Sequence, residues 1–269
     1  MIELQAHSTV SDGQLEPAAV VEAAAKAGVT TLALSDHDAV AGVPEASRAA
    51  ADLRLDLVPA VEISCVHEYA DDLHMLGYWI DIEAIAPACE RAQQERVNRA
   101  GEIVERLRAL GFVLTLEDAI AESGDALSVG RPHIARAAGT KPEQMDAFFA
   151  EYLVPGAKAF VPRRWPAAEE AVALIHNTGG AAVVAHPYWD VKDPAQVERL
   201  IEALDLEGVE AFYPDHSREQ TEHLLRICSN RGLVATASSD FHGPTHKTFS
   251  SFGAYQTYGL GDPTVPARP

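Results

Sequence analysis

The chain has 269 residues, which is enough for one large α/β domain, alone or with an insertion. Hydrophobic residues make up 47% of it, which argues against global disorder, and its three cysteines, with no C-x-x-C pattern, argue against a disulfide framework or a zinc–cysteine site. The formal net charge of -19 disfavours capture of long duplex nucleic acid, whereas a small phosphorylated substrate stays compatible with it because bound divalent cations reverse the field locally.

The first part of the chain alternates short apolar runs with amphipathic segments. Pro17 at an early helical position and Gly28 just past the last one delimit the first helix. Alternating strands and helices favour a mainly parallel sheet. We expect strands at residues 2–7, 30–35, 57–63 and 73–80, and helices at residues 16–28 and 44–53.

A helical region follows, from about residue 87 to residue 152. It opens with the long charged amphipathic segment ACERAQQERVNRAGEIVERLRAL and continues with shorter helices at 116–122, 131–138 and 143–152. The alternation then resumes, with helices at 167–177, 194–204 and 217–231 and strands at 181–185, 208–212 and 233–238.

About seven strands in this arrangement suggest an open or distorted barrel. The sequence predicts a discontinuous barrel domain (1–84 and 160–258), a helical insertion (85–159) that could cover the barrel mouth, and an irregular Pro-rich tail (259–269). The N-terminus has no signal-peptide pattern and no apolar run reaches bilayer length, so we expect a cytoplasmic protein with no membrane partner.

Histidines and acids recur where the expected strands end, or within the fourth strand. The carboxyl ends of parallel barrel strands converge on one face, so side chains far apart in the sequence should meet there. The residues concerned are His7, Asp12, Asp36, His37, Asp38, Glu62, His74, His186, Asp240 and His242.

Simpler interpretations exist for each of these residues alone. A single histidine at a strand end is more often a hydrogen-bonded structural residue than a ligand, and Asp12, Asp36 and Asp38 fit helix caps or turns. The coincidence of so many favours a metal centre, because burying them unpaired is costly and cations satisfy them together. Imidazoles and carboxylates without cysteine suit Mn, Fe or Zn in a multinuclear hydrolytic site.

The spacing of six segments resembles, in order, the signature motifs of the PHP (polymerase and histidinol phosphatase) family. The segment GVEAFYPDH (208–216) and the helical insertion look like the subgroup of stand-alone phosphoesterases that includes 3′,5′-nucleoside bisphosphate phosphatases and related 5′-to-3′ exonucleases. The six segments are AHSTVSDG (6–13), LALSDHDAVAG (32–42), VEIS (61–64), LHMLGY (73–78), VVAHP (183–187) and SSDFHG (238–243).

The resemblance implies a distorted (β/α)₇ barrel of PHP type that holds two or three divalent ions, drawn from Mn, Fe, Zn and Mg. It implies that Glu62 bridges two of them. It further implies that His7 and Asp240 complete the first site, that His74 and His186 complete the second, and that Asp12, His37 and His242 hold the third.

One position departs from the family pattern, whose opening motif normally reads Asp-Leu-His-x-His. Here it reads Glu3-Leu4-Gln5-Ala6-His7, so that Gln5 occupies a ligand position. A glutamine carbonyl coordinates hard cations but is a weaker ligand than imidazole. The first site is therefore expected to bind weakly, to prefer Mg or Mn, or to stay empty.

Substrate groups are less sharply defined. Arg131 and His133 match positions where the subgroup places phosphate-binding residues, and an ordinary surface arginine at a helix start is an equally good interpretation. Lys158 is a second candidate, shifted by one from the family's usual lysine. His216 is expected to contact phosphate or to protonate the leaving group. The tryptophans are assigned to the core or rim rather than to base stacking, and Trp189, just after His186-Pro187, is the one placed to touch substrate.

The sequence thus predicts a metal-dependent phosphoesterase that hydrolyses a phosphate monoester of a small nucleotide or short oligonucleotide by attack of metal-activated hydroxide. Two alternatives stay open. One is a non-catalytic sensor of a phosphorylated metabolite with a metal site impaired at Gln5, and the other is an amidohydrolase-type enzyme acting on C–N bonds. The latter class usually bridges its metals with a carboxylated lysine, and no lysine lies at an expected strand end. The oligomeric state is not readable from the sequence.

Overall fold

The computed structural model describes residues 1–122 and 129–269, which form two compact units. The first, the barrel unit, comprises residues 1–89 and 165–269, and the second, the helical unit, comprises residues 90–164. Both boundaries of the helical unit fall a few residues later than the sequence-based expectation of 85–159. Each unit has a hydrophobic core of its own and is described by itself.

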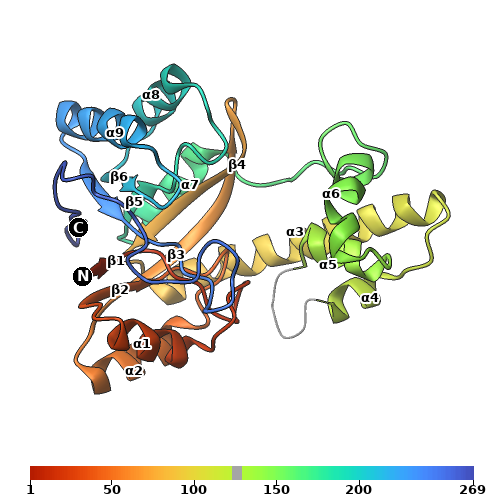
Figure 1. Ribbon diagram of the computed structural model, residues 1–269, viewed down its shortest axis with the longest axis horizontal. Coiled ribbons are helices and arrows are strands. Elements are labelled where there is room, and N and C mark those ends of the chain that lie inside the picture. Colours follow the sequence, from red (N-terminus) through yellow and green to blue (C-terminus); the bar gives the residue numbers. More distant parts are fainter. Residues whose placement is uncertain (123–128) are drawn as a thin grey trace. The chain divides into compact units, whose positions relative to one another are not determined.

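Seven strands form the sheet of the barrel unit, each hydrogen-bonded to its neighbours in sequence order. They are β1 (Ile2–Glu3), β2 (Thr31–Leu34), β3 (Asp56–His67), β4 (Ala70–Tyr78), β5 (Ala181–Val184), β6 (Gly208–Phe212) and β7 (Val234–Ala237). Leu4 N donates to Ala237 O at 3.1 Å and His7 N to Phe241 O at 2.8 Å, which joins the two ends of the sheet. The result is the nearly closed, distorted (β/α)₇ barrel that the sequence predicts (Figure 1).

The direction of β4 is the main distortion of the barrel. β4 pairs antiparallel with both β3 and β5, whereas the other pairs are parallel. The expected end of the third strand, at residue 63, is wrong, because residues 64–67 continue the ladder and turn back into β4. Glu62 therefore lies inside a strand, opposite Leu76, and not at a strand end.

Regular pairing of β1 is shorter than the expected strand at 2–7. Only Ile2 and Glu3 pair regularly with β2, and Ala6 makes an isolated bridge to Phe241. The backbone at Gln5–His7 thus leaves the regular ladder and crosses toward the end of β7.

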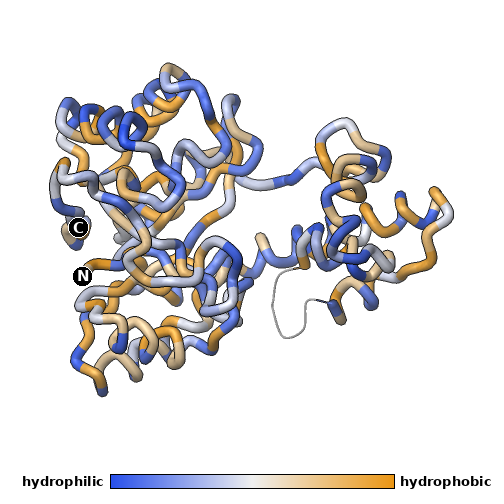
Figure 2. The backbone as a smooth tube through the Cα atoms, viewed as in Figure 1, coloured by the Kyte–Doolittle hydropathy of each residue, from blue (hydrophilic) through white to orange (hydrophobic). Residues whose placement is uncertain are grey.

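Helices surround the strands of the barrel unit. They are α1 (Pro17–Lys26), α2 (Val43–Leu53), α7 (Ala168–Asn177), α8 (Pro194–Ala203) and α9 (Arg218–Arg231). Hydrophobic and hydrophilic stretches alternate along α8 and α9, as expected for helices with one buried face (Figure 2). α9 begins with a capping box between Ser217 and Gln220 and ends at Gly232, whose positive φ of 71° closes the helix.

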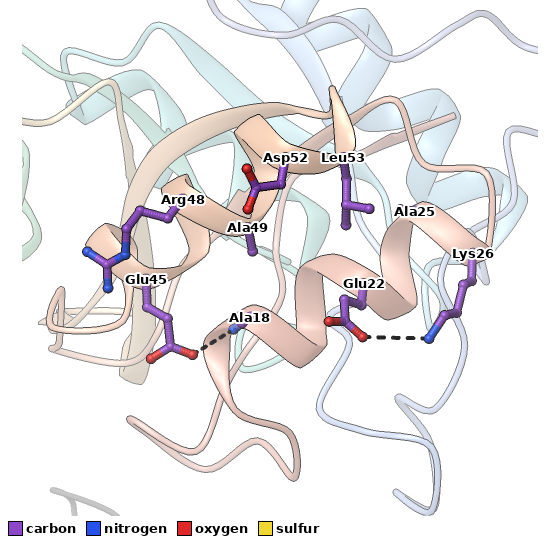
Figure 3. A pocket seen from close by; sticks show the side chains of 9 residues that line it. All are labelled: Ala18, Glu22, Ala25, Lys26, Glu45, Arg48, Ala49, Asp52 and Leu53. Carbon is purple, nitrogen blue, oxygen red and sulfur yellow. Dashed lines mark hydrogen bonds and ion pairs between the residues drawn. The ribbon is translucent and has the colours of Figure 1, made fainter.

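α1 and α2 lie side by side and leave a shallow groove on their outer surface (Figure 3). Glu45 Oε1 accepts a hydrogen bond from Ala18 N at 3.1 Å, which caps the start of α1 with a carboxylate. Small residues such as Ala25 and Ala49 line the groove. Its lining holds none of the candidate ligands, so we assign it to packing of the two helices.

The helical unit contains residues 90–109 of α3 (Ile82–Ala109), α4 (Leu116–Ala121), α5 (Arg131–Ala137) and α6 (Met145–Phe148). Ile103, Leu107 and Phe148 belong to its hydrophobic core. The single helix expected at 143–152 is instead a 3₁₀ turn (Pro142–Gln144), α6 and a π turn (Phe149–Leu153) in succession. Within the described residues, no helix has the length and apolar character needed to cross a bilayer.

Candidate metal centre

The loop after β1 carries two candidate ligands, His7 and Asp12, and is fixed by Asp36 at the end of β2. The Asp36 carboxylate accepts hydrogen bonds from Ser8 N, Ser8 Oγ and Ser11 Oγ, each at 2.7 Å. All three donors lie between His7 and Asp12 in the chain. Asp36 is thus a positioning residue for this loop, which goes beyond the turn-forming role open to it from sequence.

Glu62 is the centre of the cluster, and five side chains face its fully buried carboxylate. Glu62 Oε2 lies 2.9 Å from Gln5 Nε2, 3.1 Å from His7 Nε2 and 3.4 Å from His37 Nδ1, and Oε1 lies 2.7 Å from His74 Nδ1 and 3.3 Å from His186 Nε2. The two oxygens thus face two different sets of imidazoles. This division is the geometry that a carboxylate shared between two cations requires.

Two further carboxylates complete the arrangement. Asp240 Oδ1 lies 3.0 Å from His7 Nε2, on the side of Glu62 Oε2. Half-exposed Asp12 lies beyond, with Oδ1 3.4 Å from His242 Nε2 and Oδ2 3.9 Å from His37 Nε2.

Three overlapping sets of donor atoms arise, with the atoms of each set within 4.8 Å of one another. They are His7, Asp12, His37 and His242; His37, Glu62 and His74; and His7, Glu62 and Asp240. Glu62 is the carboxylate common to the second and third sets, and Asp12 is the carboxylate of the first.

Backbone strain marks three positions around the cluster. Asp38, His186 and Asp240 all have positive φ, of 47°, 25° and 55°, a conformation that costs energy for residues other than glycine. Such strain persists only where surrounding contacts over-determine it, and Asp38 Oδ1 accepts a hydrogen bond from Ser64 N at 3.0 Å.

Buried glutamates supply the contacts that fix His186 and Asp240. Glu210 accepts hydrogen bonds from His186 N at 2.8 Å and Ser238 Oγ at 2.5 Å. Glu3 accepts hydrogen bonds from Ser239 N at 2.5 Å and Ser239 Oγ at 2.8 Å, immediately before Asp240. Burial raises the pKa of each glutamate to about 7, although these hydrogen bonds oppose the shift.

The donor set fits divalent cations. His7 Nε2, His37 Nδ1 and Asp240 Oδ1 are buried and have no hydrogen-bond partner in the described part of the chain. Buried polar atoms are nearly always satisfied, so several orphans facing one another indicate a missing partner. Burial opposes protonation of His7, yet the nearby carboxylates of Asp240 and Glu62 raise its pKa well above the usual range. A cation can take the place of that proton between the two carboxylates.

Gln5 contributes to the cluster through its amide. Gln5 Nε2 donates to Glu62 Oε2 at 2.9 Å, and Gln5 Oε1 accepts a hydrogen bond from Ser238 Oγ at 3.4 Å. Oε1 is the only atom of the amide able to coordinate a cation. In this orientation it faces Ser238 and not the carboxylate cluster. Gln5 thus orients Glu62.

His216 lies apart from the cluster. Its Nδ1 is 3.1 Å from Ala211 O, and its ring packs against the rings of Tyr188 and Tyr213. Burial lowers the pKa of His216 to about 4, so the imidazole is neutral near neutral pH. A neutral imidazole disfavours the role of protonating the leaving group, whereas a contact between His216 and the substrate stays possible.

The remaining sequence-predicted residues lie in the helical unit, where their contacts are local. Arg131 Nη1 donates to Leu153 O at 3.4 Å, and its guanidinium lies 5.7 Å from the ring centre of Phe149. His133 Nδ1 accepts a hydrogen bond from Gly130 N at 2.9 Å and caps α5. Lys158 is exposed and pairs with Glu151 at 2.5 Å. These last contacts give His133 and Lys158 structural partners within their own unit.

The sequence did not single out two residues with contacts of interest, one beside the metal cluster and one in the helical unit. Tyr213 donates a hydrogen bond from its hydroxyl to Asp240 Oδ2 at 2.9 Å. In the helical unit, Arg99 Nε donates to Val161 O at 2.9 Å, while its Nη2 is buried without a partner among the described residues. Tyr213 stands in the segment GVEAFYPDH (208–216) but follows a strand as aromatics commonly do, and Arg99 is one of many charges on α3.

Known proteins share this fold. A crystal structure assigned as a metal-dependent phosphoesterase from Bifidobacterium adolescentis superposes with a TM-score of 0.79 at 30% identity, over 94% of this chain and 91% of that one. The barrel and its buried cluster of imidazoles and carboxylates define a metal-dependent phosphoesterase, a phosphoric ester hydrolase.

The chain belongs to the PHP domain family, whose model matches residues 3–247, and the resemblance seen in the sequence is confirmed. It is 32% identical to a 3′,5′-nucleoside bisphosphate phosphatase of Chromobacterium violaceum, over 90% of this chain and 87% of that protein. It is 34% identical to the 5′-3′ exoribonuclease Rnm of Escherichia coli, over 90% of this chain and 85% of that protein.

Proposed function

We propose that this chain hydrolyses a phosphate monoester of a small nucleotide, such as a 3′,5′-nucleoside bisphosphate, or of a short oligonucleotide. The observation that carries the proposal is Glu62, whose two oxygens face separate sets of imidazoles. The activities named for the relatives, a nucleoside bisphosphate phosphatase and an exoribonuclease, support a nucleotide substrate. The net charge of -19 favours small substrates over long polyanions.

The chain's residues have distinct roles in this proposal. Two or three divalent cations, of Mn, Fe, Zn or Mg, when bound lower the pKa of water and offset charge on phosphoryl oxygens. Glu62, His7 and Asp240 would hold one cation, and Glu62, His74 and His186 would hold a second. Asp12, His37 and His242 would hold a third. Gln5 and Tyr213 orient the two central carboxylates, Glu62 and Asp240, through hydrogen bonds.

Arginines of the helical unit are the proposed partners of the substrate's anionic groups. Burial, together with the nearby charge of Arg131, lowers the pKa of Arg99 to about 10. Two half-buried guanidinium groups that repel each other are stabilised by an anion, and the unpartnered Nη2 of Arg99 offers it a donor. We assign this role to Arg99 and Arg131 rather than to Lys158, which Glu151 already neutralises.

A substrate panel tests the proposal. The protein, loaded in turn with Mn, Mg, Zn and Fe, is incubated with adenosine 3′,5′-bisphosphate, AMP, a 5′-phosphorylated dinucleotide and a long duplex, and released phosphate and nucleoside products are measured. We expect turnover of the small esters with at least one metal and none of the duplex. Failure to hydrolyse any of them with any metal would refute the proposal.

A second candidate function is a sensor that binds a phosphorylated metabolite without turning it over. Gln5 is the observation that favours it, since its amide replaces an imidazole donor of the family pattern. A sensor would bind the same nucleotides in equilibrium measurements and release no phosphate from them. Retention of all eight other candidate ligands in one cluster favours the enzyme.

A further inference from the structure

A pocket of about 290 Å³ adjoins the metal centre in the barrel unit. It is formed by the loops that follow β5 and β6 and by the first turn of α9, and Trp189, Tyr213 and His216 are among its walls. No candidate cation ligand lines it, so the chemistry proposed above does not account for it.

The pocket is one side chain away from the cluster. Tyr213, in its wall, donates to Asp240 Oδ2 at 2.9 Å. The ring of His186 lies 5.0 Å from that of Tyr213 and 6.1 Å from that of Trp189, measured between ring centres. The pocket and the cluster thus share Tyr213 as a common wall.

Aromatic side chains give the pocket flat apolar walls. Tyr188, Trp189 and Tyr213 all line it, and Trp189 is 45% exposed, although tryptophan carries a large apolar surface. Flat aromatic walls bind planar rings by stacking. This shape and surface suit a planar heterocycle.

The polar end of the pocket offers hydrogen-bond acceptors. His216 is buried, and since its Nδ1 faces the carbonyl of Ala211, its Nε2 presents a lone pair. That Nε2 has no partner among the residues the structure describes, and such orphans are rare in folded proteins. The carboxylate of Asp215 lines the same pocket, whereas the ammonium of Lys192 donates to Tyr188 O at 2.7 Å and to Trp189 O at 2.5 Å.

We propose that this pocket is the nucleobase subsite, in which Trp189 stacks on the base and His216 Nε2 accepts a hydrogen bond from an exocyclic amino group. The proposal rests on the nucleotide substrate proposed above and adds a specificity to it. Bases with an amino group, such as adenine, should be preferred over bases without one, because the buried acceptor of His216 stays unsatisfied with the latter.

The first test compares esters with and without a base. For the Mn-loaded protein, kcat/KM is measured with adenosine 3′,5′-bisphosphate and with its abasic analogue, 1-deoxyribose 3,5-bisphosphate. We expect the base to raise kcat/KM about tenfold or more. Trp189→Ala should reduce this ratio severalfold, and Trp189→Phe, which retains a flat ring, should keep most of it. An unchanged ratio in Trp189→Ala would overturn the subsite.

The second test addresses His216. The wild-type protein should prefer the adenosine bisphosphate over the purine riboside bisphosphate, which lacks the amino group, by about 2–10-fold, the range of one hydrogen bond. His216→Ala should lose this preference, and its melting temperature shows whether the variant is folded. A folded variant that retains the preference, or a wild-type protein without one, would remove His216 from base recognition.

Binding separates this inference from the proposed function. Adenosine without phosphate should quench the fluorescence of the wild-type protein, and Trp189→Phe should lose most of the quenching although Trp79 and Trp165 remain. Quenching without turnover of any ester would refute the phosphatase but keep the subsite. Turnover with neither quenching nor base selectivity would refute the subsite alone.

Discussion

At the scale of single residues, the account depends on how Glu62 divides its two oxygens. Oε1 faces His74 and His186, and Oε2 faces His7 and His37. Burial disfavours its charge, yet the imidazoles of His37 and His74 hold the pKa of Glu62 well below its usual range. A carboxylate that is ionised, buried and surrounded on both sides is suited to bridging cations.

We expect Gln5 to affect how tightly a cation binds beside Glu62 Oε2. Its amide donates to Glu62 Oε2 and adds no imidazole, so Gln5→His should raise the affinity of the weakest Mn site, by about tenfold. Calorimetric titration of Mn into the metal-free protein measures this change. Gln5→Leu, which removes the amide and adds no donor, is the matched variant and should weaken binding. Equal affinity and stoichiometry in all three proteins would show that position 5 does not act on the cations.

His216 predicts a pH dependence of stability. Its folded-state pKa of about 4 lies below the ordinary histidine value of 6.5, so the folded protein binds fewer protons than the unfolded chain between these values. The stability it contributes is present above about pH 6.5 and is lost as pH falls toward 4. Between roughly pH 6.5 and 5, wild type should lose about 2 kcal/mol more than His216→Asn does. Urea unfolding of the metal-free proteins measures this, and parallel pH profiles would contradict it.

At the scale of elements, apolar runs and caps predicted the strands and helices of the barrel well. The run at Thr31–Leu34 and the helix from Pro17 are examples, since burial on both faces and a proline start leave few alternatives. The antiparallel direction of β4 was not predictable, because hydrophobic periodicity carries no strand direction. His74 thus reaches the centre from a reversed strand and not from the carboxyl end of a parallel one.

The loop between β1 and α1 is the element that the candidate ligands depend on most. Asp36 holds it through three hydrogen bonds, so Asp36→Ala should loosen residues 8–12 and lower Mn affinity, by about 10–100-fold. Hydrogen exchange of this loop and Mn titration measure the two effects. Asp52→Ala, at an exposed position of α2, is the control and should change neither. If Asp36→Ala weakened Mn binding while the loop stayed rigid, Asp36 would act as a ligand of the cations and not as a positioning residue.

At the scale of the whole molecule, the sequence predicted a barrel interrupted by a helical region, and the structure divides the chain into two such units. Motif order predicted which side chains gather at Glu62. It did not predict Tyr213 or Arg99, whose importance lies in one hydrogen bond and one unpartnered atom, and neither property has a sequence pattern. Substrate-binding residues depend on single contacts of this kind, whereas the candidate metal ligands stand in recognisable sequence motifs.

The helical unit should affect substrate affinity without affecting the metals. Arg99→Ala and Arg131→Ala should each raise KM for adenosine 3′,5′-bisphosphate by about 10–100-fold, the effect of a hydrogen bond to a charged group, and leave the Mn content unchanged. Steady-state kinetics and elemental analysis measure both. Arg136→Ala, which breaks an exposed ion pair with Glu122 in the same unit, is the control. Unchanged KM in both variants would exclude the two arginines from substrate binding.

The central claim is that cations bind on both sides of Glu62. Anomalous diffraction at the Mn edge, from crystals soaked in Mn, tests it most directly. The account predicts two or three peaks inside the cluster, each roughly 2.2 Å from donor atoms of residues that include His7, His74 and Asp240, with loss of the central peaks in Glu62→Gln. Crystals with full Mn occupancy elsewhere and no peak beside Glu62 would contradict it.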